Sequence, residues 1–338
     1  FLPAFSARSQ AVVTWLAWLL LSGLFSPAFP LGLTGFFQKS VVVLAGYTAG
    51  LYSRGKRCWW QVVMLALALS VFLIFIQAYA APPYPSAWVS PTEQGTVPFR
   101  VTGAGLNPNT TGLFLAFLIP VFLAGWEEEH IVLNKGEKYL TGIFFLLMLP
   151  ALVFSFSRTA WVATVCALLF YWGRKRVFLF RFLLVLLIVV LLVPSLLMRI
   201  KAPLQSSTFQ YRRYIWQETW DLVENYPLTG VGKQALSSYL QQTPSLGVDH
   251  LHNHYRQLVA ENGVPAFFIF AWIVYTYIIM PFVRPTKKSP ASLLERGVGA
   301  ALLGQLVAGM AESIWASPLL HFLFWFGFAL LDGGNIGE

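Results

Sequence analysis

The chain has 338 residues, of which 57% are hydrophobic and only 11% are charged, whereas a soluble domain carries about 25% charged residues. This composition excludes most soluble enzymes and predicts a polytopic membrane protein. A formal net charge of +9 is compatible with nucleic-acid binding in a soluble protein, but in a membrane protein it first reports topology. We therefore expect no nucleic-acid partner. The two cysteines, Cys58 and Cys166, predict neither a disulfide framework nor a zinc site.

Apolar segments that approach the length of a membrane-spanning helix, about 20 residues, occur about ten times along the chain. In chain order they are 11–25, 32–52, 59–80, 110–126, 139–157, 159–173, 177–198, 257–283, 297–315 and 317–332. They predict an all-α polytopic integral membrane protein in which residues 1–338 form a single transmembrane domain. Because the chain begins with Phe rather than Met, we expect its native start to be missing.

Lys and Arg residues set the expected orientation, because they concentrate in short cytoplasmic loops. Alternating the predicted spans places every dense basic cluster on one side, which is then cytoplasmic together with both ends of the chain. These clusters are Arg54, Lys56 and Arg57; Lys135 and Lys138; Arg174, Lys175 and Arg176; and Arg284, Lys287 and Lys288. The long segments 81–109 and 199–256 are therefore predicted to be the first and the large periplasmic loops, where polar chemistry has room.

The large loop contains a pattern typical of an amphipathic helix over residues 211–223. Residues that share one face recur at helical spacing: Arg212, Trp216, Trp220 and Val223. Pro227 ends this pattern, and 228–232 predicts a tight turn. One interpretation is an interfacial helix with aromatic anchors. The other is that Arg212 or Arg213 holds an anionic substrate, because a guanidinium matches phosphate oxygens.

Three of the five histidines follow Asp249 within a few residues: His250, His252 and His254. A metal site is one interpretation, although the only close carboxylate is that of Asp249. Structural packing of an interfacial histidine is a second. The third is a general base, because the positive end of a helix dipole disfavours the imidazolium and keeps the imidazole neutral.

Single charged residues at the predicted membrane edge also need an explanation. Arg158 occupies a very short outward turn, where it either snorkels to the interface or binds a ligand. Arg100 precedes the fourth predicted span, and Asn109 is a candidate ligand contact or only the N-cap of that helix. Lys39 and Glu312 lie within predicted spans towards the outer side and are candidates for lining the same cavity.

The predicted outer face thus offers arginines and histidines but few carboxylates. Paired acids for glycoside hydrolysis are not evident, and the sequence has no nucleophile elbow, Walker loop or dinucleotide fingerprint. Several arginines beside one base can hold a diphosphate leaving group while a hydroxyl is deprotonated and attacks the carbon that bears it.

This combination resembles the O-antigen ligase and O-antigen polymerase superfamily of bacterial envelope enzymes. Four pieces within residues 99–270 carry the resemblance in the family's order: Gly103 to Asn109, Ser157-Arg158, Arg212-x-x-x-Trp216 running to Pro227 and the turn 228–232, and His252-Asn253 followed after nine residues by Gly263. Ala266 stands where the ligases usually have a second glycine. The family commonly has about twelve spans, so the resemblance implies that an N-terminal hairpin is missing here.

The resemblance implies a metal-independent, cofactor-free glycosyltransferase of the inner membrane. It would transfer a glycan from undecaprenyl diphosphate to an acceptor hydroxyl at the periplasmic face, with inversion at the anomeric carbon. In a ligase the acceptor is a sugar of lipid A-core, and in a polymerase it is another lipid-linked repeat. Membrane lipids surround the spans.

Specific roles follow only from the resemblance. His252 corresponds to the catalytic base, with His254 as the second candidate. The diphosphate would be bound by four arginines, Arg158, Arg212, Arg213 and Arg100, and supporting residues would be Asn109, Trp216, Asn253 and Gly263.

Three other functions remain open at this point. The spacing after His252-Asn253 favours a ligase over a polymerase of the same superfamily. A secondary transporter would carry inverted repeats and charges near the bilayer centre, whereas the polar residues here gather in outer loops. A scaffold in envelope assembly would not depend on His252 or Arg212.

Overall fold

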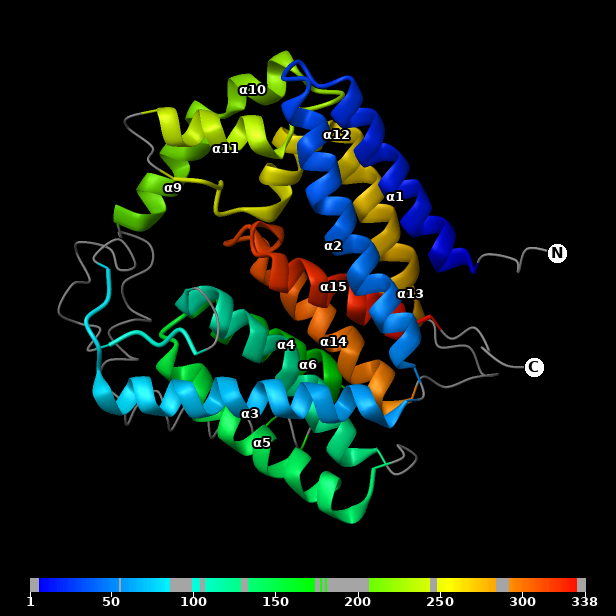
Figure 1. Ribbon diagram of the computed structural model, residues 1–338, viewed down its shortest axis with the longest axis vertical. Coiled ribbons are helices and arrows are strands. Elements are labelled where there is room, and N and C mark those ends of the chain that lie inside the picture. The colour runs from blue at the N-terminus through cyan, green and yellow to red at the C-terminus, as the bar shows by residue number, and fades with distance from the viewer. Residues whose placement is uncertain are drawn as a thin grey trace. The chain divides into compact units, whose positions relative to one another are not determined.

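A computed structural model describes residues 6–54, 56–85, 99–103, 107–128, 133–173, 177, 180, 207–243, 248–283 and 292–332. Every regular element within these ranges is a helix (Figure 1). The chain forms two compact units. Unit 1 comprises Phe1–Arg54, Arg212–Ala291 and Gly309–Glu338, and unit 2 comprises Gly55–Tyr211 and Ser292–Ala308.

The structure confirms a helical membrane protein. Among the described residues, four helical stretches are long and apolar enough to cross a membrane: Cys58–Ala80, Pro108–Glu127, Lys135–Phe154 and His254–Phe282. Of the predicted span 177–198 the structure describes only residues 177 and 180, so this span lies almost entirely outside the described residues. The other predicted segments also contain helices, but these are shorter or less apolar than the four.

Unit 2 is built around α4 (Pro108–Glu127), which packs against α5 (Lys135–Phe154), α6 (Arg158–Trp172) and α14 (Leu293–Ala308). Helix α3 (Arg57–Ala80) packs against α5. The N-cap of α4 is Asn107, whose side chain accepts a hydrogen bond from the Thr110 backbone N–H. Asn109 is therefore not the cap but a residue of the first helical turn.

Unit 1 contains α1 (Ala7–Leu24), α2 (Leu31–Ser53), α12 (His254–Val274) and α15 (Pro318–Leu330). Helix α2 packs against α15 and α1, and α1 packs against α12 (Figure 1). Gly46 and Gly50 allow the α2–α15 contact, because a Cβ atom at either position would lie within 2.6 Å of an α15 carbonyl oxygen.

The shorter helices of this unit surround the start of α12. They are α10 (Trp220–Asn225), α11 (Lys233–Gln242) and the 3₁₀ turn η4 (Ile314–Ala316). Helix α9 (Ser207–Glu218) belongs to unit 1 from Arg212 onward. The amphipathic helix predicted over 211–223 is thus two helices that meet at Thr219. Helix α12 continues through the π-helical turn η3 (Tyr275–Ile279) into α13 (Met280–Val283).

Helix α12 is broken at Gly263, whose φ of 79° and ψ of 169° are not helical. The break frees carbonyl oxygens that the helix no longer uses, and Pro265 has no N–H to donate to Glu261. The backbone N–H groups of Val231 and Gly232 replace the missing donors. They bond to the carbonyls of Ala260 and Glu261, each at 2.9 Å.

The turn 227–232 therefore completes the hydrogen bonding of the broken helix. The Val264 N–H donates in return to the Pro227 carbonyl at 2.7 Å. Gly230, with a φ of 63°, and Gly263 are required because a Cβ at either position would collide with backbone atoms of the opposite segment. The turn 227–232 and the break of α12 at Gly263 thus pack directly against each other, and we call this contact the joint.

A buried ion pair lies beside this joint. Lys39 of α2 and Glu261 of α12 are 7% and 5% exposed, and Lys39 Nζ lies 2.5 Å from both Glu261 Oε2 and Asn262 Oδ1. Glu261 also accepts a hydrogen bond from Gln257, whose own oxygen accepts from the Leu251 N–H at 2.9 Å. The sequence predicts that Lys39 is a candidate for lining the outer cavity, and in the structure Lys39 pairs with Glu261.

Replacing Lys39 by methionine is expected to lower the free energy of unfolding by about 3–5 kcal/mol, because Glu261 is left as an uncompensated buried charge. The unfolding of purified protein in mixed detergent–SDS micelles measures this. The double variant Lys39→Met, Glu261→Gln removes both charges and should recover most of the loss. A Lys39→Met variant as stable as wild type would contradict a structural ion pair.

Candidate functional site

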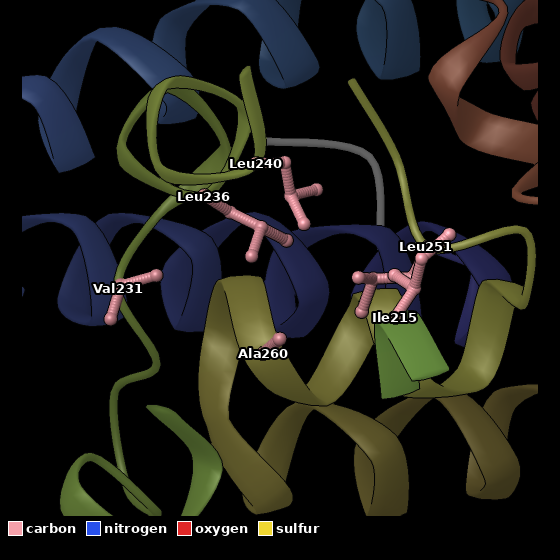
Figure 2. Close-up of a cluster of buried hydrophobic side chains, with 6 residues drawn as sticks. All are labelled: Ile215, Val231, Leu236, Leu240, Leu251 and Ala260. Carbon is pink, nitrogen blue, oxygen red and sulfur yellow. The ribbon is translucent and has the colours of Figure 1, made fainter. Parts of the chain in front are cut away.

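A small hydrophobic core holds the segment that carries the histidines. Ile215, Val231, Leu236, Leu240, Leu251 and Ala260 are each no more than 6% exposed and form one buried cluster. Figure 2 shows these side chains pointing toward one another from α9, the turn 227–232, α11, the loop before α12 and α12 itself. Leu251 immediately precedes His252, so its burial in this cluster anchors the histidine segment.

Both backbone groups of Leu251 are also fixed. Its N–H donates to Gln257 Oε1, and its carbonyl accepts a 2.8 Å hydrogen bond from the indole N–H of Trp216 on α9. Trp216 of α9 thus holds the histidine segment, which precedes α12, through a hydrogen bond to its backbone. His252 itself has a φ of 49°, a left-handed conformation that few residues other than glycine adopt and that histidine tolerates better than most.

The other side of His252 is attached to the loop 309–313, which follows α14. The Asn253 side chain caps α12 by accepting from the Arg256 N–H and donates to the Met310 carbonyl at 2.9 Å. The His254 N–H donates to the Gly309 carbonyl at 2.7 Å. The sequence pattern predicted that Glu312 lies within a membrane-spanning helix. This prediction is wrong, because α14 ends at Ala308 and Glu312 lies in the loop that follows it.

The loop brings the Glu312 carboxylate to His252 and Arg212. Glu312 Oε2 lies 3.3 Å from His252 Nδ1, and Oε1 lies 3.3 Å from Arg212 Nη2. Glu312 is 6% exposed, whereas His252 and Arg212 are half-buried. One buried carboxylate thus bridges the two residues that the sequence marked as base and anion ligand. We call His252, Glu312 and Arg212 the polar cluster.

The electrostatics of the polar cluster keep His252 neutral and Glu312 ionised. Burial lowers the pKa of the His252 imidazole and outweighs the hydrogen bond and charge of Glu312, which raise it. Burial also raises the pKa of Glu312, but His252 and Arg212 outweigh burial and hold that pKa well below its usual value. The Glu312 carboxylate accepts a hydrogen bond from the Nδ1–H of the neutral His252 ring, which leaves the Nε2 lone pair available.

His254 has different surroundings. It is 2% exposed and lies among aromatic rings, with the Trp315 ring centroid at 4.6 Å and that of Phe270 at 5.5 Å. In the described part of the chain its Nε2 has no hydrogen-bond partner. This burial among aromatic rings favours a packing role for His254.

The helix face that carries Arg213 lines a groove. Trp216 and Trp220 form its aromatic wall, and the guanidinium of Arg256 lies 4.8 Å from the centroid of the Trp216 ring. Arg213 and Gln217 contribute polar groups at the rim. Trp216, which lines this groove, also donates its indole N–H to the carbonyl of Leu251, the residue before His252.

The remaining predicted site residues belong to unit 2. Arg158 is the first residue of α6 and follows the N-cap Ser157. Arg100 is 6% exposed, and its Nη2 donates to Asn109 Oδ1 at 3.0 Å and to the Ser155 carbonyl at 3.4 Å. The structure therefore joins Arg100 and Asn109, which the sequence had separately marked. Gly105 lies outside the described residues.

Two carboxylates, those of Glu312 and Asp249, make contacts that the sequence alone does not indicate. Glu312 was only one of several charges near the outer side, because nothing in the sequence connects it to His252 across 60 positions. In the sequence Asp249 is the only carboxylate close to the histidines, and in the structure its Oδ1 lies 2.5 Å from Nδ1 of His250. Adjacency of Asp249 and His250 was the one available signal.

The helical fold and the polar cluster define a membrane protein with a neutral imidazole and a guanidinium beside one buried carboxylate. Residues 143–271 match the family model described as O-antigen ligase, and this match confirms the predicted resemblance to the O-antigen ligase and polymerase superfamily. The matched segment contains Arg158, Arg212, His252 and Gly263. No curated protein matches the chain. Members of the family are glycosyltransferase-like enzymes that act on lipid-linked glycans.

Proposed function

We propose that this protein is a glycosyltransferase of the bacterial inner membrane that moves a glycan from undecaprenyl diphosphate to an acceptor hydroxyl at the periplasmic face. The favoured activity is that of an O-antigen ligase, which attaches O-antigen to lipid A-core. The observation that carries the proposal is the polar cluster, because it combines a neutral base with a phosphate-binding side chain inside one unit.

The proposed step uses His252 as the general base. Its Nε2 takes the proton of the acceptor hydroxyl, and the hydroxyl oxygen attacks the anomeric carbon of the donor. The bond from that carbon to the diphosphate breaks, and its electron pair leaves with the diphosphate. Attack opposite to the leaving group inverts the anomeric carbon. Glu312 keeps the proton of His252 on Nδ1 throughout the approach, as an orienting carboxylate does in other base dyads.

The arginines are proposed to stabilise the departing diphosphate. Arg212 uses one of its five donors on Glu312, and its remaining donors suit phosphate oxygens. Arg213 is proposed as its support at the rim of the groove. Arg158 and Arg100 keep their proposed roles at the diphosphate on the strength of the resemblance, and substitution of each residue tests them separately.

The pH profile should report the base. The neutral imidazole is the active form, so kcat/KM falls as pH falls through the pKa of His252, which lies below its ordinary 6.5. Glu312 raises this pKa, and His250, Arg212 and burial lower it. Glu312→Gln should therefore slow transfer and move the acid limb to lower pH. A limb displaced to higher pH in this variant would contradict the assigned charge effect.

The nearest rival activity is that of a polymerase of the same superfamily. Product analysis in cells that lack this protein separates the two. Lipid A-core without polymer, together with accumulated long lipid-linked polymer, supports the ligase. Lipid A-core capped with single repeats supports the polymerase.

A purified-protein assay tests the proposal itself. Protein incubated with lipid-linked donor and candidate acceptors should form the glycosylated acceptor and release undecaprenyl diphosphate. A secondary transporter would instead show substrate-dependent ion flux in liposomes that survives His252→Ala and Arg212→Ala. A scaffold would retain its cellular function with both substitutions, and either result would overturn the proposal.

A further inference from the structure

We propose that His250, His252 and Glu312 form a binding site for a transition-metal dication such as Zn²⁺, and that its occupancy switches off glycan transfer. Each of the three residues offers one ligand atom, and these atoms lie within 4.8 Å of one another. The inhibitory consequence rests on the proposed function, whereas metal binding does not.

One pair of ligand atoms already has the spacing that a metal requires. Metal–ligand bonds of about 2.0–2.2 Å place two ligands of a tetrahedral zinc ion about 3.4 Å apart. His252 Nδ1 and Glu312 Oε2 are 3.3 Å apart. Because the three ligand atoms lie within 4.8 Å of one another, the His250 ring needs to approach by no more than about 1.4 Å to complete the set. Its centroid is 4.2 Å from that of His252, and its side chain is 21% exposed.

A second observation singles out His250 as a ligand. The Asp249 carboxylate lies 2.5 Å from its Nδ1, which fixes the ring and directs Nε2 to a different partner. Metal-binding histidines almost always make such a hydrogen bond to a carboxylate or carbonyl through the nitrogen that does not bind the metal. The negative charge of Asp249 and its hydrogen bond to Nδ1 also make the Nε2 lone pair of His250 a stronger ligand for a cation.

The donor set selects the kind of metal. Two imidazole nitrogens and one carboxylate oxygen suit Zn²⁺ and its neighbours in the transition series, whereas Mg²⁺ and Ca²⁺ prefer oxygen ligands alone. Arg212 holds the other oxygen of Glu312 at 3.3 Å, and its positive charge opposes a dication. This combination favours reversible binding over a permanently bound cofactor.

Metal binding and proton acceptance exclude each other at His252. A metal on Nδ1 replaces the proton there, and the neutral ring must then carry its proton on Nε2. Nε2 has no lone pair left to accept the proton of a hydroxyl. A metal on Nε2 would occupy that lone pair directly. In either case the imidazole remains neutral and ceases to be a base.

The test uses the full-length protein, stripped of metal with EDTA and titrated with ZnCl₂. Isothermal titration calorimetry and elemental analysis measure binding, and glycan transfer is followed in parallel. We expect one Zn²⁺ per chain, loss of transfer over the same concentration range, and full recovery when EDTA is added. MgCl₂ should neither bind here nor inhibit.

Two variants localise the site. Asp249→Asn should weaken Zn²⁺ binding about 10-fold or more, as removal of an orienting carboxylate does, and His250→Gln should weaken it further. Both should transfer glycan at the wild-type rate in EDTA, with inhibition curves displaced by the same factor as binding. Asp221→Asn, on the exposed face of α10, is the matched charge control and should behave as wild type.

Unchanged Zn²⁺ affinity in His250→Gln and Asp249→Asn would overturn the metal site. Transfer that is lost in EDTA and restored by Zn²⁺ would overturn the inhibitory role and assign the metal to catalysis. Absence of transfer by wild-type protein both in EDTA and with added Zn²⁺ contradicts the proposed function alone, because Zn²⁺ binding to the variants still decides whether the site exists.

Discussion

His252→Ala is expected to lower glycan transfer by about 10²–10⁴-fold, the range that a positioned general base contributes. The substituted protein should insert and accumulate normally, because the His252 side chain is half-buried and its neighbours Leu251 and Asn253 carry the structural contacts. The measurement is the initial rate of transfer by purified protein at pH 7.5 in EDTA, set against protein quantity.

His250→Gln is the control for this substitution, since it removes a neighbouring imidazole and leaves the polar cluster intact. Arg158→Ala should also abolish transfer if that residue binds the diphosphate. Wild-type rates in His252→Ala would remove the base from the proposal. Wild-type rates in Arg158→Ala would leave the base in place and remove only the assignment in unit 2.

Gly263→Ala is expected to have the largest effect on stability. The left-handed backbone at this position costs about 1–3 kcal/mol for a residue with a side chain. A Cβ here would also lie 2.0 Å from the Leu228 carbonyl oxygen, so the turn 227–232 must move. Each buried backbone group that then loses its partner costs about 1–3 kcal/mol more. The sum is comparable with the whole stability of many domains.

The thermal midpoint and the yield of folded protein after detergent extraction measure this effect. Gly136→Ala is the matched control, because a Cβ there meets only a side-chain oxygen at 3.4 Å and alanine favours a helix over glycine. Gly136→Ala should be neutral or slightly stabilising. A Gly263→Ala variant with wild-type stability would contradict the joint between α12 and the turn.

Much of the fold could be predicted from the sequence because its signals are local. Long apolar segments predicted the helices, and the recurrence of Arg212, Trp216, Trp220 and Val223 at helical spacing predicted a helix around Trp216. The residue types that resemble a ligase motif also marked Arg212 and His252, which the structure brings into one cluster. These features depend on neighbours a few residues apart, which is the range over which periodicity carries information.

The rest of the site depends on contacts between distant segments. The Glu312 loop reaches His252 only because α14 ends early, and the sequence pattern continued that helix through residue 315. Lys39 and Glu261 form an ion pair although they are far apart in the sequence. The aromatic residues around His254 come from separate helices. No single-sequence period encodes such pairings, because tertiary packing decides them.

The attachment of the histidine segment to the loop 309–313 has a consequence for biogenesis. A chain made from its N-terminus presents His252, Asn253 and the start of α12 well before residues 309–313 exist. Until that loop arrives, the proposed base has no carboxylate to orient it, and the N–H groups of Asn253 and His254 lack their partners. Assembly of the polar cluster is therefore a late event in synthesis, and a chain ending before the loop would contain the proposed base without its carboxylate partner.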